Sequence, residues 1–118
     1  MKTQIAVSLL AMLVMGSASG QSVLVRGMPD CGEWVKDRQQ RERAVFAAAS
    51  ELWVVGYLSG LAIGLNTNLW GHPNVNELRP ESVFLWIDNY CRANPLKNVD
   101  AAANALFVER CPKPSACR

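Results

Sequence analysis

The chain has 118 residues, half of them hydrophobic, and it carries twelve Lys and Arg against ten Asp and Glu. This length is enough for one domain with a single hydrophobic core. A formal net charge of +2 gives no electrostatic reason to expect nucleic acid or an anionic membrane surface as a partner. The composition therefore favours a small globular domain and argues against binding that depends on bulk charge.

The first twenty residues have the layout of a secretory signal peptide. After a basic start, residues 5–15 form an apolar run, and Ala18 and Gly20 are the small residues expected before a cleavage site at Gln21. The run is too short to span a bilayer as a helix; the alternative is a buried N-terminal helix. We expect cleavage near Gly20/Gln21, a periplasmic or secreted protein, and a single mature domain over 21–118.

All four cysteines, Cys31, Cys91, Cys111 and Cys117, lie after this segment. An even number of cysteines in a small exported domain indicates disulfides, and three pairings are possible. We favour Cys31–Cys91 with Cys111–Cys117, because the last two enclose a short turn that contains two prolines. A zinc site is the weaker alternative, since no C-x-x-C pair exists and His72 is the only histidine. We therefore expect disulfides, no metal and no cofactor.

Capping residues, prolines and apolar periodicity predict an all-α fold, a small disulfide-stapled bundle of about four helices. The predicted helices cover 31–40, 42–66, 80–94 and the segment that follows Asn98. Asp30, with Glu33 three residues later, forms a capping box for the first helix, and Pro80 suits the first turn of the third. The expected inward residues of the fourth helix are Val99, Ala102, Ala103, Leu106 and Phe107.

The second helix is apolar on two sides. One stripe contains Val45, Ala49, Leu52, Trp53, Gly56, Gly60 and Ile63, and the other contains Val54, Leu58, Leu61 and Leu65. Such a helix is either central to the fold or shared with another subunit. Residues 44–65 carry a single charge, Glu51, which raises a transmembrane alternative. Two observations argue against a membrane span. Glu51 would be costly inside a bilayer, and the basic residues that precede the helix would lie outside the membrane after export, against the usual preference for the cytoplasmic side. We therefore expect no stable membrane insertion.

Three glycines of this helix, Gly56, Gly60 and Gly64, are spaced by four residues. Each costs a helix up to about 1 kcal/mol relative to alanine, so a close approach of another helix should offset the cost. Two interpretations stay open: packing against the third or fourth helix of the same chain, or the seam of a homodimer.

Charged residues of the helices can pair at i,i+4 spacing, as Asp37–Arg41, Arg38–Glu42 and Asp88–Arg92. A solvated helix face explains them. The histidine lies in a loop with no evident orienting partner, and no glycine loop precedes a helix to hold phosphate. We therefore expect that the protein is not an enzyme.

Three segments together resemble a known group of proteins: CGEW at 31–34, WVVGYLSG at 53–60 and WIDNYCRANPL at 86–96. They resemble the Rap/Tai-like immunity proteins of type VI secretion systems. The resemblance implies an all-helical periplasmic protein with an internal disulfide between Cys31 and Cys91, often a homodimer. It implies binding over the active-site cleft of a peptidoglycan amidase effector, and it makes Gly56, Tyr57 and Gly60 packing residues.

The sequence is also similar to the Hde-type acid-stress chaperones, which implies a second function: partial unfolding in acid and capture of unfolded clients. For a protein partner, the candidate contact residues are Trp70 and His72 in the loop 66–77, Leu85 and Asn89 on the outer side of the third helix, and Trp86 at the boundary of that side. A large aromatic side chain in a polar loop is a plausible interface anchor. The alternative for Trp70 is that it folds back over the core.

Overall fold

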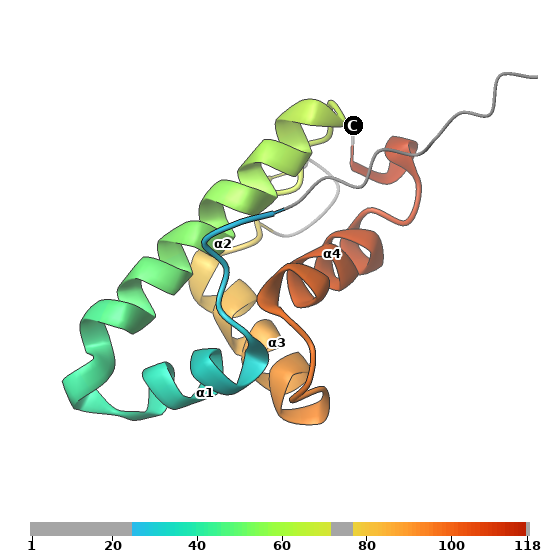
Figure 1. Ribbon diagram of the computed structural model, residues 1–118. Coiled ribbons are helices and arrows are strands. Elements are labelled where there is room, and N and C mark those ends of the chain that lie inside the picture. The colour runs from blue at the N-terminus through green and yellow to red at the C-terminus, as the bar shows by residue number, and fades with distance from the viewer. Residues whose placement is uncertain (1–24, 72–76, 118) are drawn as a thin grey trace, which may run out of the picture.

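The computed structural model describes residues 25–71 and 77–117, which form an all-α fold (Figure 1). The elements in chain order are α1 (Cys31–Gln39), the 3-10 turn η1 (Arg41–Arg43), α2 (Ala44–Gly64), α3 (Pro80–Ala93), α4 (Val99–Arg110) and the 3-10 turn η2 (Pro114–Cys117). The predicted fold class is confirmed. The predicted signal peptide and His72 lie outside the described residues.

The helix ends follow from local sequence signals. The side chain of Asp30 accepts a hydrogen bond from the backbone N of Glu33 at 2.7 Å and so caps α1, as predicted. Pro80 occupies the first turn of α3, where its missing N–H costs no hydrogen bond. After α2 the chain turns at Asn66, whose φ of 50° lies in the left-handed region that asparagine tolerates.

α1 and α4 each pack against both α2 and α3, so α2 and α3 lie at opposite corners of the bundle. The core between them contains Trp34 from α1, Val54 and Leu58 from α2, and Val83 and Ile87 from α3, all fully buried. From α4 the predicted inward residues Val99, Ala102, Ala103, Leu106 and Phe107 are all buried, which confirms that prediction.

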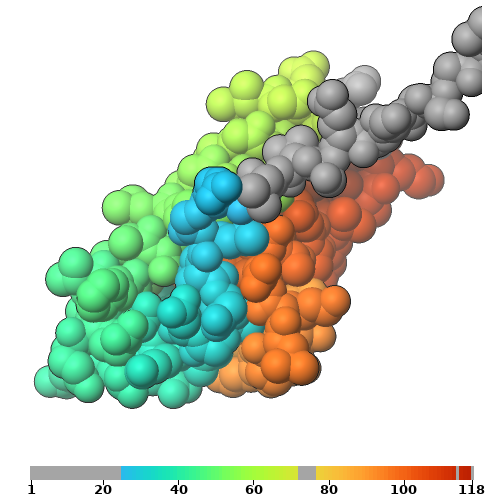
Figure 2. Space-filling view, in the orientation of Figure 1, coloured from blue at the N-terminus to red at the C-terminus, as the bar shows by residue number. Residues whose placement is uncertain are grey.

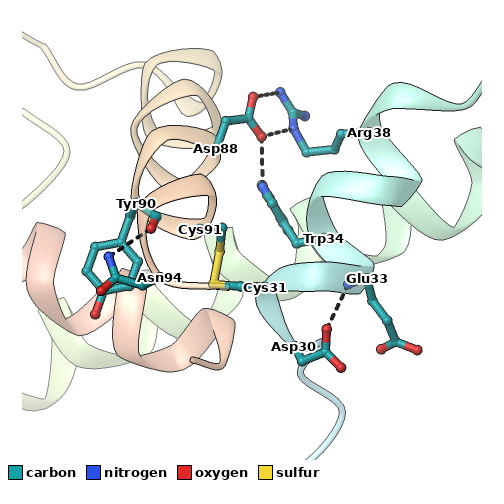
Figure 3. Close-up of a disulfide and its surroundings, with 9 residues drawn as sticks. All are labelled: Asp30, Cys31, Glu33, Trp34, Arg38, Asp88, Tyr90, Cys91 and Asn94. Carbon is teal, nitrogen blue, oxygen red and sulfur yellow. Dashed lines mark hydrogen bonds and ion pairs between the residues drawn. A yellow bond between two sulfur atoms is a disulfide. The ribbon is translucent and has the colours of Figure 1, made fainter. Parts of the chain in front are cut away.

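Two disulfides hold the ends of these helices. Cys31 at the start of α1 is bonded to Cys91 near the end of α3, with 4.8 Å between their Cα atoms (Figure 3). Cys111 is bonded to Cys117 across a short C-terminal turn. The favoured pairing is confirmed and no cysteine is free. Structural disulfides of this kind indicate an oxidising environment outside the cytosol.

α2 covers the core with one face only. Its buried residues are Ala47, Val54, Leu58 and Ala62. Most of the stripe that begins at Val45 faces outward instead, with exposed fractions of 79% for Val45, 73% for Leu52 and 81% for Ile63. Its Trp53 is the exception, because it is half-buried and packs against the core. The helix is therefore not central to the fold of a single chain. The sequence could not decide this, because periodicity shows that two faces of a helix are apolar but not which of them is covered.

By length and composition, the segment Arg41–Gly64 could cross a membrane, with a mean hydropathy of 1.5. Only 28% of its most apolar window is buried within the chain, whereas a core helix of a soluble protein is mostly buried. In Figure 2 the green atoms of α2 form the left-hand edge of the molecule. A long apolar helix thus lies at the periphery of a small domain.

Candidate functional site

A cluster of ionised side chains joins three helices. Arg38 of α1 donates to both carboxylate oxygens of Asp88 in α3, through Nε at 2.6 Å and Nη2 at 3.1 Å, and it also pairs with Glu51 of α2. The indole Nε1 of Trp34 donates to the same carboxylate at 2.8 Å (Figure 3). Because a bidentate pair fixes both distance and orientation, this cluster sets how α1 and α3 lie against each other.

Arg38 is embedded in this cluster rather than solvated. Burial alone lowers the pKa of Arg38, but the hydrogen bond and the charge of Asp88, together with Glu51, outweigh it and raise the pKa above its ordinary value. Its guanidinium carbon also lies 5.2 Å from the ring centroid of Trp34 and 5.5 Å from that of Phe84. The carboxylates are therefore occupied by a cation that keeps its charge, which suits a structural role.

The predicted i,i+4 ion pairs are wrong. Asp88 binds Arg38 across the bundle, and Arg92 donates to Asn89 instead, at 3.1 Å. Asp37 is buried and pairs with Arg43, because α1 ends at Gln39 and the chain enters η1 before one more helical turn is complete. The predicted pairs Asp37–Arg41 and Arg38–Glu42 assumed one continuous helix, and the break between α1 and η1 removes that geometry.

The predicted contact residues of α3 lie on its outer surface. Leu85 is 61% exposed, and Asn89, one turn later, is exposed beside it. Trp86 is half-buried and stacks on Tyr90, with 5.6 Å between ring centroids and 18° between ring planes. The structure therefore brings an aliphatic, an aromatic and an amide side chain together along one helix.

Beside Trp86 lies a hollow of about 430 Å³ between α3 and α4. Its lining residues are Leu78, Ser82, Trp86, Leu106, Glu109 and Arg110. Apolar side chains surrounded by polar ones are the usual anatomy of a protein-binding patch. The α4 side of this hollow was not predicted, because a hollow between two helices depends on how they pack together and leaves no pattern within either helix.

Trp70 does not join this surface. It is half-buried, packs against the core, and donates from Nε1 to Ser59 Oγ of α2 at 3.1 Å. This is the alternative arrangement considered for Trp70, in which the ring folds back over the domain. The other predicted loop residue, His72, lies outside the described residues.

The glycines and the tyrosine of α2 have different surroundings. Tyr57 packs within the chain: it stacks on Trp53 at 4.9 Å between centroids, and its hydroxyl donates to Asn104 Oδ1 of α4 at 3.1 Å. Apart from its chain neighbours and the nearby backbone of its own helix, a Cβ atom added at Gly56, Gly60 or Gly64 would meet no described atom within 4 Å. Packing of the glycines against the third or fourth helix is therefore wrong, since α3 and α4 are both fully described.

Metal binding and catalysis have little support in the part of the chain that the structure describes. Within residues 25–71 and 77–117, no group of three His, Cys, Asp or Glu side chains could hold a metal ion. The four thiols are consumed by the disulfides, and Asp88 and Glu51 are engaged by Arg38. Among the described residues, the surface of α3 with its hollow toward α4 is the candidate site that we consider further.

Comparison with known proteins adds no further assignment: no protein-family model matches the chain, and no curated protein or solved structure is significantly similar to it. The likeness to the immunity proteins therefore rests on the three quoted segments alone.

Proposed function

We propose that this protein is an exported binding protein that neutralises a protein partner, and specifically a periplasmic immunity protein that inhibits a peptidoglycan amidase effector. The observation that carries the binding role is the surface of α3: Trp86 lines a hollow that has both apolar and polar lining residues, and Leu85 of the same helix is largely exposed. The amidase as target follows from the resemblance of the three sequence segments, and export follows from the first twenty residues and cleavage near Gly20/Gln21.

The way α3 is held supports this proposal. Its C-terminal turn is bonded to α1 through Cys31–Cys91, and its middle is held by the bidentate pair of Asp88 with Arg38. A surface on a helix that is fixed at two points loses little conformational entropy when a partner binds. Such rigidity is what an inhibitor that blocks a cleft needs.

The test is to titrate an amidase encoded next to this gene with the oxidised domain 21–118. We expect inhibition at a one-to-one ratio. Trp86→Ala and Leu85→Glu should each weaken inhibition by ~30-fold or more, the scale of an interface hot spot. Leu96→Glu is the matched control, because Leu96 is 98% exposed in the loop between α3 and α4. Full amidase activity with excess domain would contradict the proposal.

The ion cluster favours a second candidate function, an acid-stress chaperone of the Hde type. Arg38 of α1 is held by the carboxylates of Asp88 in α3 and Glu51 in α2, so the contacts among these three helices depend in part on ion pairs. Ion pairs that involve carboxylates are a general source of lower stability in acid. An aggregation assay with unrelated client proteins separates the two functions. Suppression of aggregation at pH 2–3 but not at pH 7 would support the chaperone, and its absence would leave the inhibitor as the function to pursue.

A further inference from the structure

The outer face of α2 is unusual for a helix at the edge of a small domain. It carries no ionised side chain, since Glu51, the single charged residue between Ala44 and Gly64, points to Arg38 on the inner side. Val45, Leu52 and Ile63 on this face are each more than 70% exposed. A helix that is apolar all round is normally covered on all sides, so this face needs an occupant.

The spacing of the outward residues fits one kind of occupant, another helix. The central line of the face is Val45, Ala49, Leu52, Gly56, Ser59 and Ile63. These positions alternate steps of four and three residues, which is the a/d pattern of a coiled-coil seam over nearly three heptads. Ser59 is half-buried, and its oxygen accepts a hydrogen bond from Trp70 Nε1, so it already has a partner within the chain.

The same line is complementary to itself when two copies run antiparallel. Centred between Leu52 and Gly56, the antiparallel register places Leu52 opposite Gly56 of the other copy, and Val45 opposite Ile63. Each large side chain then meets a small one at the centre, where a Cβ at Gly56 would find 4 Å of free space. A parallel pair would instead set leucine against leucine and leave a gap at each pair of glycines.

The size of the face also matches a second copy. The exposed surface area of the face is on the order of 700 Å² per chain, which is close to the ~800 Å² per partner that a standard interface buries. This area comes from the exposed parts of Val45, Phe46, Leu52 and Ile63 and from the alanines and glycines between them. In a dimer with a two-fold axis, the same face of each copy contacts the other copy, so no second apolar face is needed.

We propose that two copies of this chain associate through the outer faces of α2, antiparallel, with Leu52 of each copy packed over Gly56 of the other. α2 and α3 lie at opposite corners of the bundle, so the α3 surface of each copy stays free in this dimer. The proposal goes beyond the inhibitory function and does not depend on it.

The oligomeric state of the oxidised domain 21–118 tests the proposal, by sedimentation equilibrium from 1 to 200 μM. We expect a dimer, and Val45→Lys or Ile63→Glu alone should weaken it at least ten-fold. Both residues are about 80% exposed, so circular dichroism should show unchanged folding. Val108→Glu, on the exposed side of α4, is the matched control and should leave the dimer intact. A monomer at every concentration, or a dimer that ignores Val45→Lys, would overturn the proposal.

The double variant Val45→Lys with Ile63→Glu tests the direction. In the antiparallel pair each new lysine faces a new glutamate, so the dimer should recover most of its affinity. In a parallel pair like charges would face each other and the double variant would stay monomeric, which would overturn the register.

The remaining occupant is lipid: a monomeric domain that floats with phosphatidylglycerol–phosphatidylethanolamine vesicles would show that the face binds membrane and not a second copy.

Discussion

Two regions of the molecule, the α1–α3 contact and the outer face of α2, contain different kinds of interaction. The first contains a disulfide, a bidentate ion pair and a buried indole hydrogen bond within a few residues of one another. The second contains small, aliphatic and aromatic side chains, and a Cβ atom added at any of its three glycines would contact no other part of the described chain within 4 Å. The difference indicates that the α1–α3 contact helps to stabilise the single chain, whereas the outer face of α2 is the surface that we propose for association.

The largest expected effect comes from the disulfides. Removing Cys31–Cys91 by a pair of alanine substitutions should lower the free energy of unfolding by ~4 kcal/mol, because it frees a loop of about sixty residues in the unfolded chain. Removing Cys111–Cys117, which closes a loop of only a few residues, should cost ~2 kcal/mol. Urea unfolding measures both. Equal losses would contradict the idea that loop length sets the difference.

The next effect concerns the ion cluster. Asp88→Ala leaves the Arg38 guanidinium and the Trp34 indole without their shared acceptor, and should lower the free energy of unfolding by about 3 kcal/mol. Asn89→Ala is the matched control, because Asn89 is exposed on the same helix and its loss should cost no more than ~0.5 kcal/mol. A loss below 1 kcal/mol for Asp88→Ala would mean that the cluster adds little to stability.

The smallest effect has the opposite sign. Gly56→Ala places a methyl group in open space on α2, so in dilute, monomeric protein it should raise the free energy of unfolding by up to ~1 kcal/mol. The same methyl separates the two backbones at the seam and should weaken the dimer several-fold. Gly32→Ala gives no such gain, because its Cβ would lie 3.1 Å from the Asp30 oxygen that caps α1. Higher stability without weaker dimerisation would place Gly56 outside the interface.

The sequence was most informative where the determinant is local. The capping oxygen of Asp30, the proline at the start of α3 and the inward residues of α4 were all predicted from patterns within one or two turns. The disulfide pairing was favoured because the last two cysteines enclose a short turn. Each of these signals involves neighbours in the chain, so no knowledge of the tertiary arrangement was needed.

Interactions between distant segments could not be predicted in the same way. Asp88 has a suitable partner four residues along its own helix, yet the structure pairs it with Arg38, fifty residues away. The two apolar sides of α2 look alike in the sequence, and only the positions of α1 and α4 decide that Val54 is covered and Leu52 is not. The hollow beside Trp86 likewise exists only once α3 and α4 are side by side.

The connectivity of the two disulfides has a consequence for how the protein matures. A polypeptide that is translocated N-terminus first presents its cysteines to the oxidising side in chain order, and both native bonds join cysteines that are consecutive in that order. An oxidase that links each newly emerged thiol to the one before it would therefore make the native bonds directly, without a thiol–disulfide exchange step to correct them. Maturation of this chain should accordingly proceed at a normal rate in cells that lack a disulfide isomerase.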